Sequence, residues 1–152
     1  MEFLASIHPK VVHFPIAFLM LYPVMETFYF FTSKDFYLKT ALLFLIIGVI
    51  GSVLAVFTGN QAYQSIVDWS KEGKEIFSAH QTYANLTVWY FAFILVARYF
   101  MIIKKKFSKK FAIIFIVLSL IGGYFVYQTG LYGAELADNL FRTKLFNTEF
   151  EK

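Results

Sequence analysis

Four long apolar stretches constrain this chain more than any other feature of its sequence. They cover residues 11–32, 37–58, 83–103 and 111–127. A helix needs about 20 apolar residues to cross a bilayer, and each stretch comes close to that length. Only 16% of the residues are charged, whereas soluble domains carry about 25%. We therefore predict an all-α integral membrane protein that resides in the lipid bilayer.

The connections between the stretches predict how the helices are arranged. The first and third connections, residues 33–36 and 104–110, are short, and the second, residues 59–79, is longer. Short connections make neighbouring helices antiparallel, so we predict one membrane domain over residues 1–152, an up-down-up-down four-helix bundle. Part of the second connection and the tail, residues 134–150, have an amphipathic pattern, which predicts short segments that lie along the membrane surface or on a partner.

The distribution of basic residues predicts the orientation in the membrane. Five of the 14 basic residues lie in the loop KKKFSKK, residues 104–110, and Lys34 and Lys39 fall on the same side of the bundle. Cytoplasmic loops are rich in lysine and arginine. We therefore predict a multi-pass protein of the bacterial inner membrane with both termini on the periplasmic side. The same loop accounts for the positive net charge, so no nucleic-acid partner is expected.

Cysteine is absent from the chain, which restricts the chemistry available to it. Disulfides, iron–sulfur clusters, thiolate zinc sites and covalently attached haem are excluded. The sequence also lacks the common nucleophile, phosphate-binding and zinc-protease motifs. Enzymatic activity is therefore left open, and any cofactor has to be held by other side chains.

An internal repeat connects two of the three histidines. The segments GVIGSVLAVFTG, residues 48–59, and SLIGGYFVYQTG, residues 119–130, share Ile-Gly and Thr-Gly at the same spacing. His13 precedes Gly59 by 46 residues, and His80 precedes Gly130 by 50 residues. We therefore predict two similar helical hairpins, each with a histidine where it begins and a Thr-Gly pair where it ends.

Two motifs resemble a known family. HPKVVHFPIA, residues 8–17, resembles the first motif of the bacterial membrane protein family called domain of unknown function 2231, and IGGYFVYQTG, residues 121–130, is similar to its glycine-rich last helix. The resemblance implies a small polytopic membrane protein and carries no settled activity. It draws attention to His8, His13 and His80 without naming their chemistry.

The leading hypothesis is one non-covalent b-type haem with His13 and His80 as axial ligands. The first and third helices lie diagonally across the bundle, so two imidazoles near the outer face would approach one iron from opposite sides. Gly59 and Gly130 would leave room for the porphyrin, and His8 would support a ligand or a propionate. Two histidine ligands favour electron transfer, with a quinol or a periplasmic redox protein as partner. The expected aromatic walls of the site are Phe14, Tyr83, Trp89, Tyr124 and Tyr127.

Two alternatives remain open at this point. His8, His13 and His80 together match the ligand number of a copper or zinc site. Otherwise the histidines are ordinary boundary residues, and the chain is a non-catalytic assembly subunit, as a homo-oligomer or within a larger membrane complex. Glu26 and Arg98 are the two charges placed within apolar stretches. They are expected to pair with each other, although Arg98 reaching toward headgroups, or a proton path through Glu26, fits the sequence as well.

Overall fold

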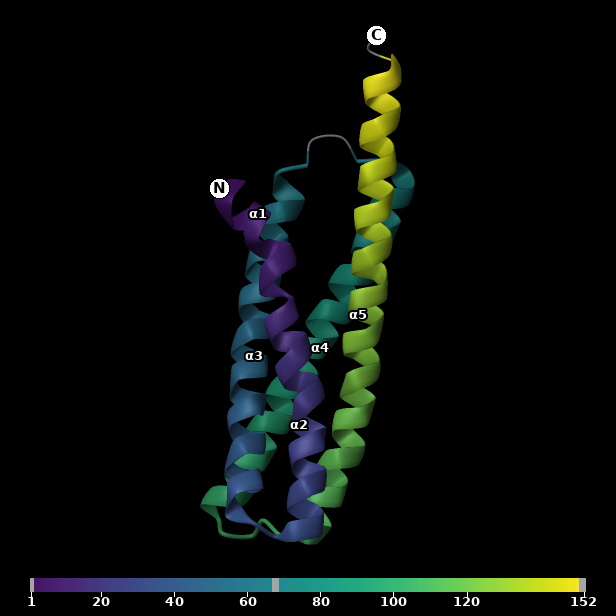
Figure 1. Cartoon of the computed structure of the whole chain (residues 1–152). Coiled ribbons are helices and arrows are strands. Elements are labelled where there is room, and N and C mark those ends of the chain that lie inside the picture. Colours follow the sequence, from purple (N-terminus) through teal and green to yellow (C-terminus); the bar gives the residue numbers. More distant parts are fainter. Residues whose placement is uncertain (1, 67–68, 151–152) are drawn as a thin grey trace.

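Long helices lying side by side make up the protein (Figure 1). The structure is a computed structural model that describes the backbone of residues 2–66 and 69–150 and the side chains of residues 3–66 and 69–143. Its helices are α1 (Glu2–Val11), α2 (His13–Thr32), α3 (Asp35–Gln64), α4 (Lys71–Ile103) and α5 (Lys109–Phe150). No strand occurs in the part of the chain that the structure describes. Four helical segments are long and apolar enough to span a membrane, so the predicted fold class is confirmed.

The helices form a ring in which α2 and α4 are diagonal neighbours. α2 packs against α3 and α5, and α4 packs against the same two helices, while α1 packs mainly on α3. Tight turns connect the helices at the end that carries Lys34, Lys39 and Lys110, which we call the lysine end. Ser33, with φ of 57°, ends α2 by donating its backbone N–H to the carbonyl of Tyr29 at 2.8 Å.

The first span differs from its prediction at the N-terminal side. The predicted first span starts at residue 11, but residues 2–11 already form α1. α1 ends at Val11 because Pro15 has no N–H to donate to the Val11 carbonyl. The Pro15 ring is buried against Gly51, where an added Cβ would lie 3.2 Å from Cδ of the proline. The proline therefore both interrupts the helix and fastens it to α3.

The segments around the second connection and in the tail, predicted to lie on the membrane surface or on a partner, belong to long helices. α3 extends to Gln64, α4 already begins at Lys71, and α5 continues without a break to Phe150. No proline interrupts these extensions, and the Ser70 hydroxyl caps α4 by accepting from the Gly73 N–H at 2.9 Å. The predicted amphipathic faces include Val67, Asp68 and the side chains beyond residue 143, which lie outside the described residues.

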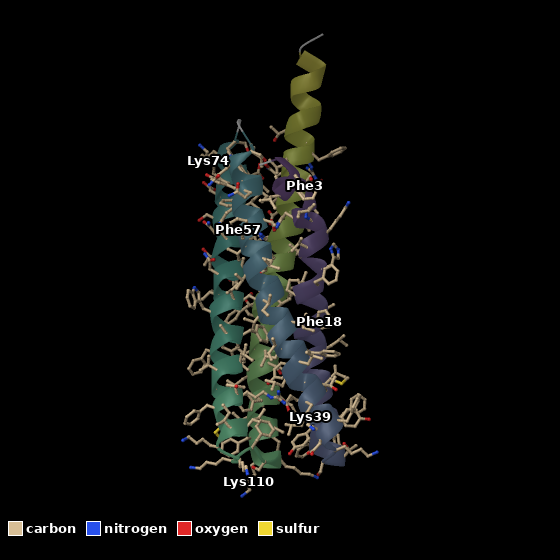
Figure 2. The ribbon with its side chains drawn as sticks, turned by 90° about the vertical axis from the view of Figure 1, so that its left-hand side faces the viewer. Phe3, Phe18, Lys39, Phe57, Lys74 and Lys110 are labelled. Atoms are coloured by element: carbon tan, nitrogen blue, oxygen red, sulfur yellow. The ribbon has the colours of Figure 1, made fainter. Side chains whose placement is uncertain are left out.

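Large apolar side chains point both into and out of the bundle. The interior contains Leu19, Leu45, Phe91, Ile94 and Phe115. Many others cover the outside, among them Trp89 at 75% and Phe93 at 69% exposure. Figure 2 shows such side chains along the length of the helices, with Lys39 and Lys110 at the lysine end and Lys74 near the other. An apolar exterior of this extent requires lipid around it.

Close packing between α4 and α5 depends on Gly122. A Cβ at this position would lie 2.5 Å from Cζ of Phe91, which is fully buried. We expect Gly122→Ala to be less stable than Gly130→Ala by about 1–3 kcal/mol, because the added methyl group overpacks the core. Gly130→Ala is the matched control, since its Cβ would meet no described atom within 4 Å. Detergent unfolding curves of the two variants measure the difference, and equal stabilities would contradict the expectation.

Candidate functional site

His8 projects from α1 onto the last turns of the apolar part of α3. Its Nδ1 atom lies 3.0 Å from the Thr58 hydroxyl oxygen. The ring lies against Gly59, where an added Cβ would be 3.0 Å from His8 Cε1 and 3.4 Å from both ring nitrogens. A side chain at position 59 would therefore push the imidazole out of its place. The glycine and the threonine together fix where the ring lies and how it is turned.

His80 is held in a similar way between α4 and α5, by one hydrogen bond and one glycine. Its Nδ1 atom lies 3.0 Å from the Thr129 backbone carbonyl oxygen. An added Cβ at Gly133 would be 3.3 Å from His80 Cε1. The hydroxyl of Thr129 also lies 3.3 Å from the hydroxyl of Thr87, the residue seven positions after His80 on α4. His80 is thus held by the backbone of the facing helix and stacked on one of its glycines.

The hydrogen bonds decide which ring nitrogen of each histidine is free. A carbonyl oxygen only accepts, so His80 Nδ1 must carry the hydrogen. The Thr58 hydroxyl directs its one hydrogen to the backbone carbonyls of Leu54 and Ala55, at 3.0 and 3.1 Å, and therefore accepts from His8 Nδ1. In both neutral rings Nε2 is left with its lone pair. Metal-ligating histidines have this arrangement, because the bond from the other nitrogen orients the ring.

The binding sites of the His8 and His80 rings are related by the internal repeat. His8 contacts Thr58, which lies 50 residues later in the chain, and His80 contacts Thr129, which lies 49 residues later. The two imidazoles are also near enough for a charge on one to act on the other. The histidine equivalent to His80 is therefore His8, and not His13 as the spacing in the sequence predicts.

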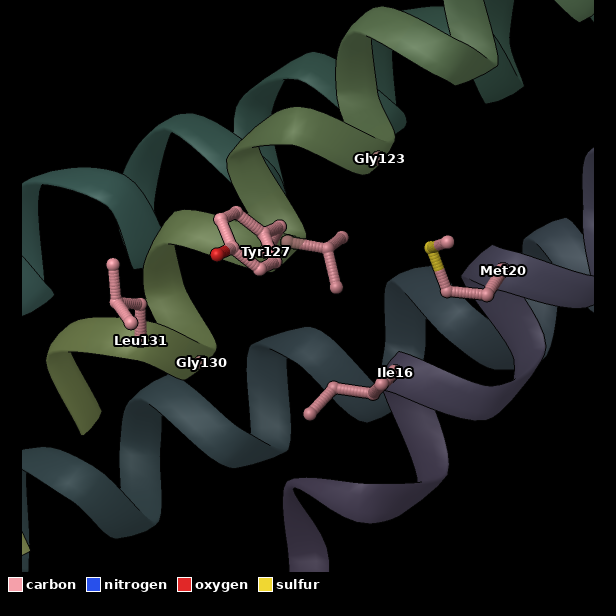
Figure 3. Close-up of a pocket in the computed structure, with 7 residues that line it drawn as sticks. Ile16, Met20, Gly123, Tyr127, Gly130 and Leu131 are labelled. Atoms are coloured by element: carbon pink, nitrogen blue, oxygen red, sulfur yellow. The ribbon is translucent and has the colours of Figure 1, made fainter. Parts of the chain in front are cut away.

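The structure does not place His13 or Gly130 beside the His8 and His80 rings. His13 is exposed near the start of α2. Gly130 lines a groove of about 330 Å³ between α2 and α5, together with Ile16, Met20, Gly123, Val126, Tyr127 and Leu131 (Figure 3). Gly59 lies against a histidine, as predicted, whereas Gly130 does not. The glycine that lies against His80 is Gly133.

Other expected features of the site are changed as well. Among the described residues, no group of three or more histidine, aspartate or glutamate side chains lies close enough to hold a metal ion. The three-histidine copper or zinc site is thus not assembled. Phe14, Trp89, Tyr124 and Tyr127 are all more than half exposed on the outside, so they do not form walls between the histidines. Tyr83 stacks on Tyr132, with ring centroids 5.5 Å apart.

Glu26 and Arg98 form an ion pair in the interior. Arg98 Nε contacts Glu26 Oε1, and both side chains are fully buried. Arg98 Nη2 also donates to the Leu38 carbonyl oxygen at 3.0 Å, so the guanidinium joins α4 to α2 and α3. The pair lies toward the lysine end, on the other side of the core from the histidines. Arg98 therefore does not reach out to headgroups.

Comparison with known proteins agrees with the membrane assignment. A family model described as "Predicted membrane protein (DUF2231)" matches residues 5–141. No curated protein matches the chain, and no solved structure matches it.

Proposed function

Since the chain belongs to the DUF2231 family of predicted membrane proteins, we propose its function from the site itself: it holds one b-type haem between His8 and His80 and relays electrons through it. The proposal keeps the cofactor expected from the sequence and changes one ligand. His8 replaces His13, because His8 has the oriented ring and His13 is exposed.

The observation that carries the proposal is the matched orientation of the two imidazoles. Each ring donates from Nδ1 to the facing helix and keeps Nε2 free. A histidine that only bonds a headgroup has no need of such an anchor. Here two anchors recur at equivalent places of two hairpins, and each is backed by a glycine that admits the ring. The two free Nε2 atoms on neighbouring hairpins would supply two histidine ligands to the iron of one haem.

Haem bound in this way would supply one-electron redox chemistry. Two imidazole ligands leave no open position on the iron, so electron transfer suits the site better than oxygen binding. The chain's own part is to hold both rings, and its apolar helices exclude water from the interior. Thr58 and the Thr129 carbonyl support the basicity of the ligands through their bonds to Nδ1. A quinol or a periplasmic redox protein would exchange electrons at the end of the bundle that carries His8 and His80.

A reduced-minus-oxidised absorption spectrum tests the proposal. The protein is purified in mild detergent after expression with a haem precursor, and haemin is also titrated into the colourless fraction. We expect a sharp α band and a Soret shift typical of two histidine ligands, with one haem per chain. A protein that stays colourless in both preparations refutes haem binding. Elemental analysis of the same sample then decides between a two-histidine metal site and an assembly role.

The orientation proposed for the chain places the lysine end in the cytoplasm. Because the chain has no cysteine, single-cysteine variants report accessibility without background. We expect a membrane-impermeant maleimide to label Ser65→Cys, beyond the α3 end, in intact cells. Ser108→Cys, in the lysine loop, should be labelled only after the membrane is opened. Labelling in the opposite order would reverse the orientation and put the histidines on the cytoplasmic side.

A further inference from the structure

Three polar atoms in the interior near the lysine end have no partner. They are the Tyr22 hydroxyl, Glu26 Oε2 and Arg98 Nη1, and none has a hydrogen-bond partner among the described residues. All three side chains are fully buried. The Tyr22 phenol lies beside the Glu26 carboxylate and interacts with it without reaching hydrogen-bond geometry, and the Arg98 guanidinium carbon is 5.5 Å from the centre of the Tyr22 ring. Donors and an acceptor thus remain unused within one cluster of three neighbouring buried side chains.

Leaving these atoms unsatisfied is costly, and the cost rises in a membrane. Each buried polar group without a partner costs about 1–3 kcal/mol, and more when it is charged. The ion pair uses only Glu26 Oε1 and Arg98 Nε, and the Leu38 carbonyl uses Arg98 Nη2. What is missing is a small group that accepts from a hydroxyl or guanidinium and donates to a carboxylate. Water is the smallest group that does both.

Phe107 covers the cluster from the lysine end. It comes from the loop between α4 and α5, and its ring centre lies 5.2 Å from the Arg98 guanidinium carbon. Its ring also stacks on Phe115 and packs against Tyr29. Arg98 precedes Lys104 by six residues, roughly 9 Å along the helix at 1.5 Å per residue. Phe107 therefore lies directly on the Arg98 guanidinium, in the loop at the lysine end.

We propose that Tyr22, Glu26 and Arg98 form an internal water-binding site that Phe107 seals from the lysine end. The bound water accepts from both the Tyr22 hydroxyl and Arg98 Nη1 and donates to Glu26 Oε2. Through such a water the carboxylate exchanges protons, so Phe107 sets how fast the cluster exchanges with the cytoplasmic side. This proposal does not depend on haem at the other end of the bundle.

Infrared difference spectra of the full-length protein in vesicles, prepared in H₂¹⁶O and in H₂¹⁸O, test for the water. We expect a narrow O–H stretching band that shifts with ¹⁸O in the wild type. It should be lost in Tyr22→Phe and kept in Tyr99→Phe, whose ring is 54% exposed. No isotope-sensitive band in the wild type, or a band unchanged in Tyr22→Phe, overturns the proposal. Should Tyr22→Phe fail to fold, the wild-type spectrum alone decides.

The seal is tested by the rate at which the same band disappears on transfer to ²H₂O. We expect Phe107→Ala to speed this exchange at least tenfold, because it opens the path to the lysine end. Phe100→Ala is the matched control, since Phe100 is 58% exposed on the outside. Equal rates in Phe107→Ala and the wild type overturn the role of Phe107.

Discussion

Replacing either His8 or His80 by alanine is expected to abolish the spectrum of haem with two histidine ligands, whereas His13→Ala should keep it. Each of the first two variants removes one free Nε2 atom and leaves the iron with one protein ligand. His13 is the matched control, since it is a histidine of the same segment that lies exposed. The measurement is the reduced α band together with the haem content of each purified variant.

The bond to His8 Nδ1 offers a finer test of the same site. Thr58→Val keeps the shape of the side chain and removes the hydroxyl that accepts from the ring. We expect haem affinity to fall about 10–100-fold, the usual cost of losing a partner that orients a metal ligand. Thr40→Val removes a hydroxyl that bonds only its own helix, to the Phe36 carbonyl, and should leave affinity unchanged.

The pattern of loss across the three histidines separates the competing interpretations. Loss in His13→Ala with retention in His8→Ala would restore the pairing expected from the sequence and contradict the one proposed from the structure. Retention in all three variants, with pigment present, would mean that haem is held elsewhere. Loss in His8→Ala and His80→Ala alone is the result that the anchored rings require.

Much of the fold is predictable because the bilayer imposes it. A membrane-spanning helix must be long and apolar, so hydropathy alone finds the four spans. The ends of the helices are less predictable, since outside the lipid nothing forces a helix to stop. α4 begins at Lys71, where Ser70 caps it, and α5 runs on to Phe150 because no proline ends it earlier. α1 also forms beyond the predicted start, and only Pro15 marks where it meets α2.

The site was predicted less completely than the fold. The repeat predicted that each histidine meets a Thr-Gly pair; His8 does so at Thr58 and Gly59, but the repeat was aligned from His13. His8 precedes Gly59 by 51 residues, closer to the 50 between His80 and Gly130 than the 46 counted from His13. Spacing alone did not reveal that the threonines, Thr58 and Thr129, hold the rings. Gly133 was missed because it lies one turn beyond the repeated segment, where no residue pattern marked it.

Breaking the buried ion pair is expected to cost about 3–5 kcal/mol of stability, because one charge is then left alone in a fully buried place. Glu26→Leu leaves Arg98 unpaired, and Arg98→Leu leaves Glu26 unpaired. The double variant Glu26→Leu with Arg98→Leu removes both charges and should recover most of the loss. Unfolding free energies in detergent micelles measure all three variants and the coupling between the two sites.

A second ion pair of the same chain serves as the control. Asp138 and Arg142 pair at 2.8 Å one turn apart on α5, with side chains 57% and 73% exposed. Asp138→Leu should change stability by less than about 1 kcal/mol, because water screens such pairs. If Glu26→Leu were as mild as Asp138→Leu, water would have to reach the Arg98 guanidinium from the lysine end. The other outcome is a large loss of unfolding free energy in each single variant that the double variant recovers. It would mean that each of the two charges, Glu26 and Arg98, is tolerated in the interior only because the other is present.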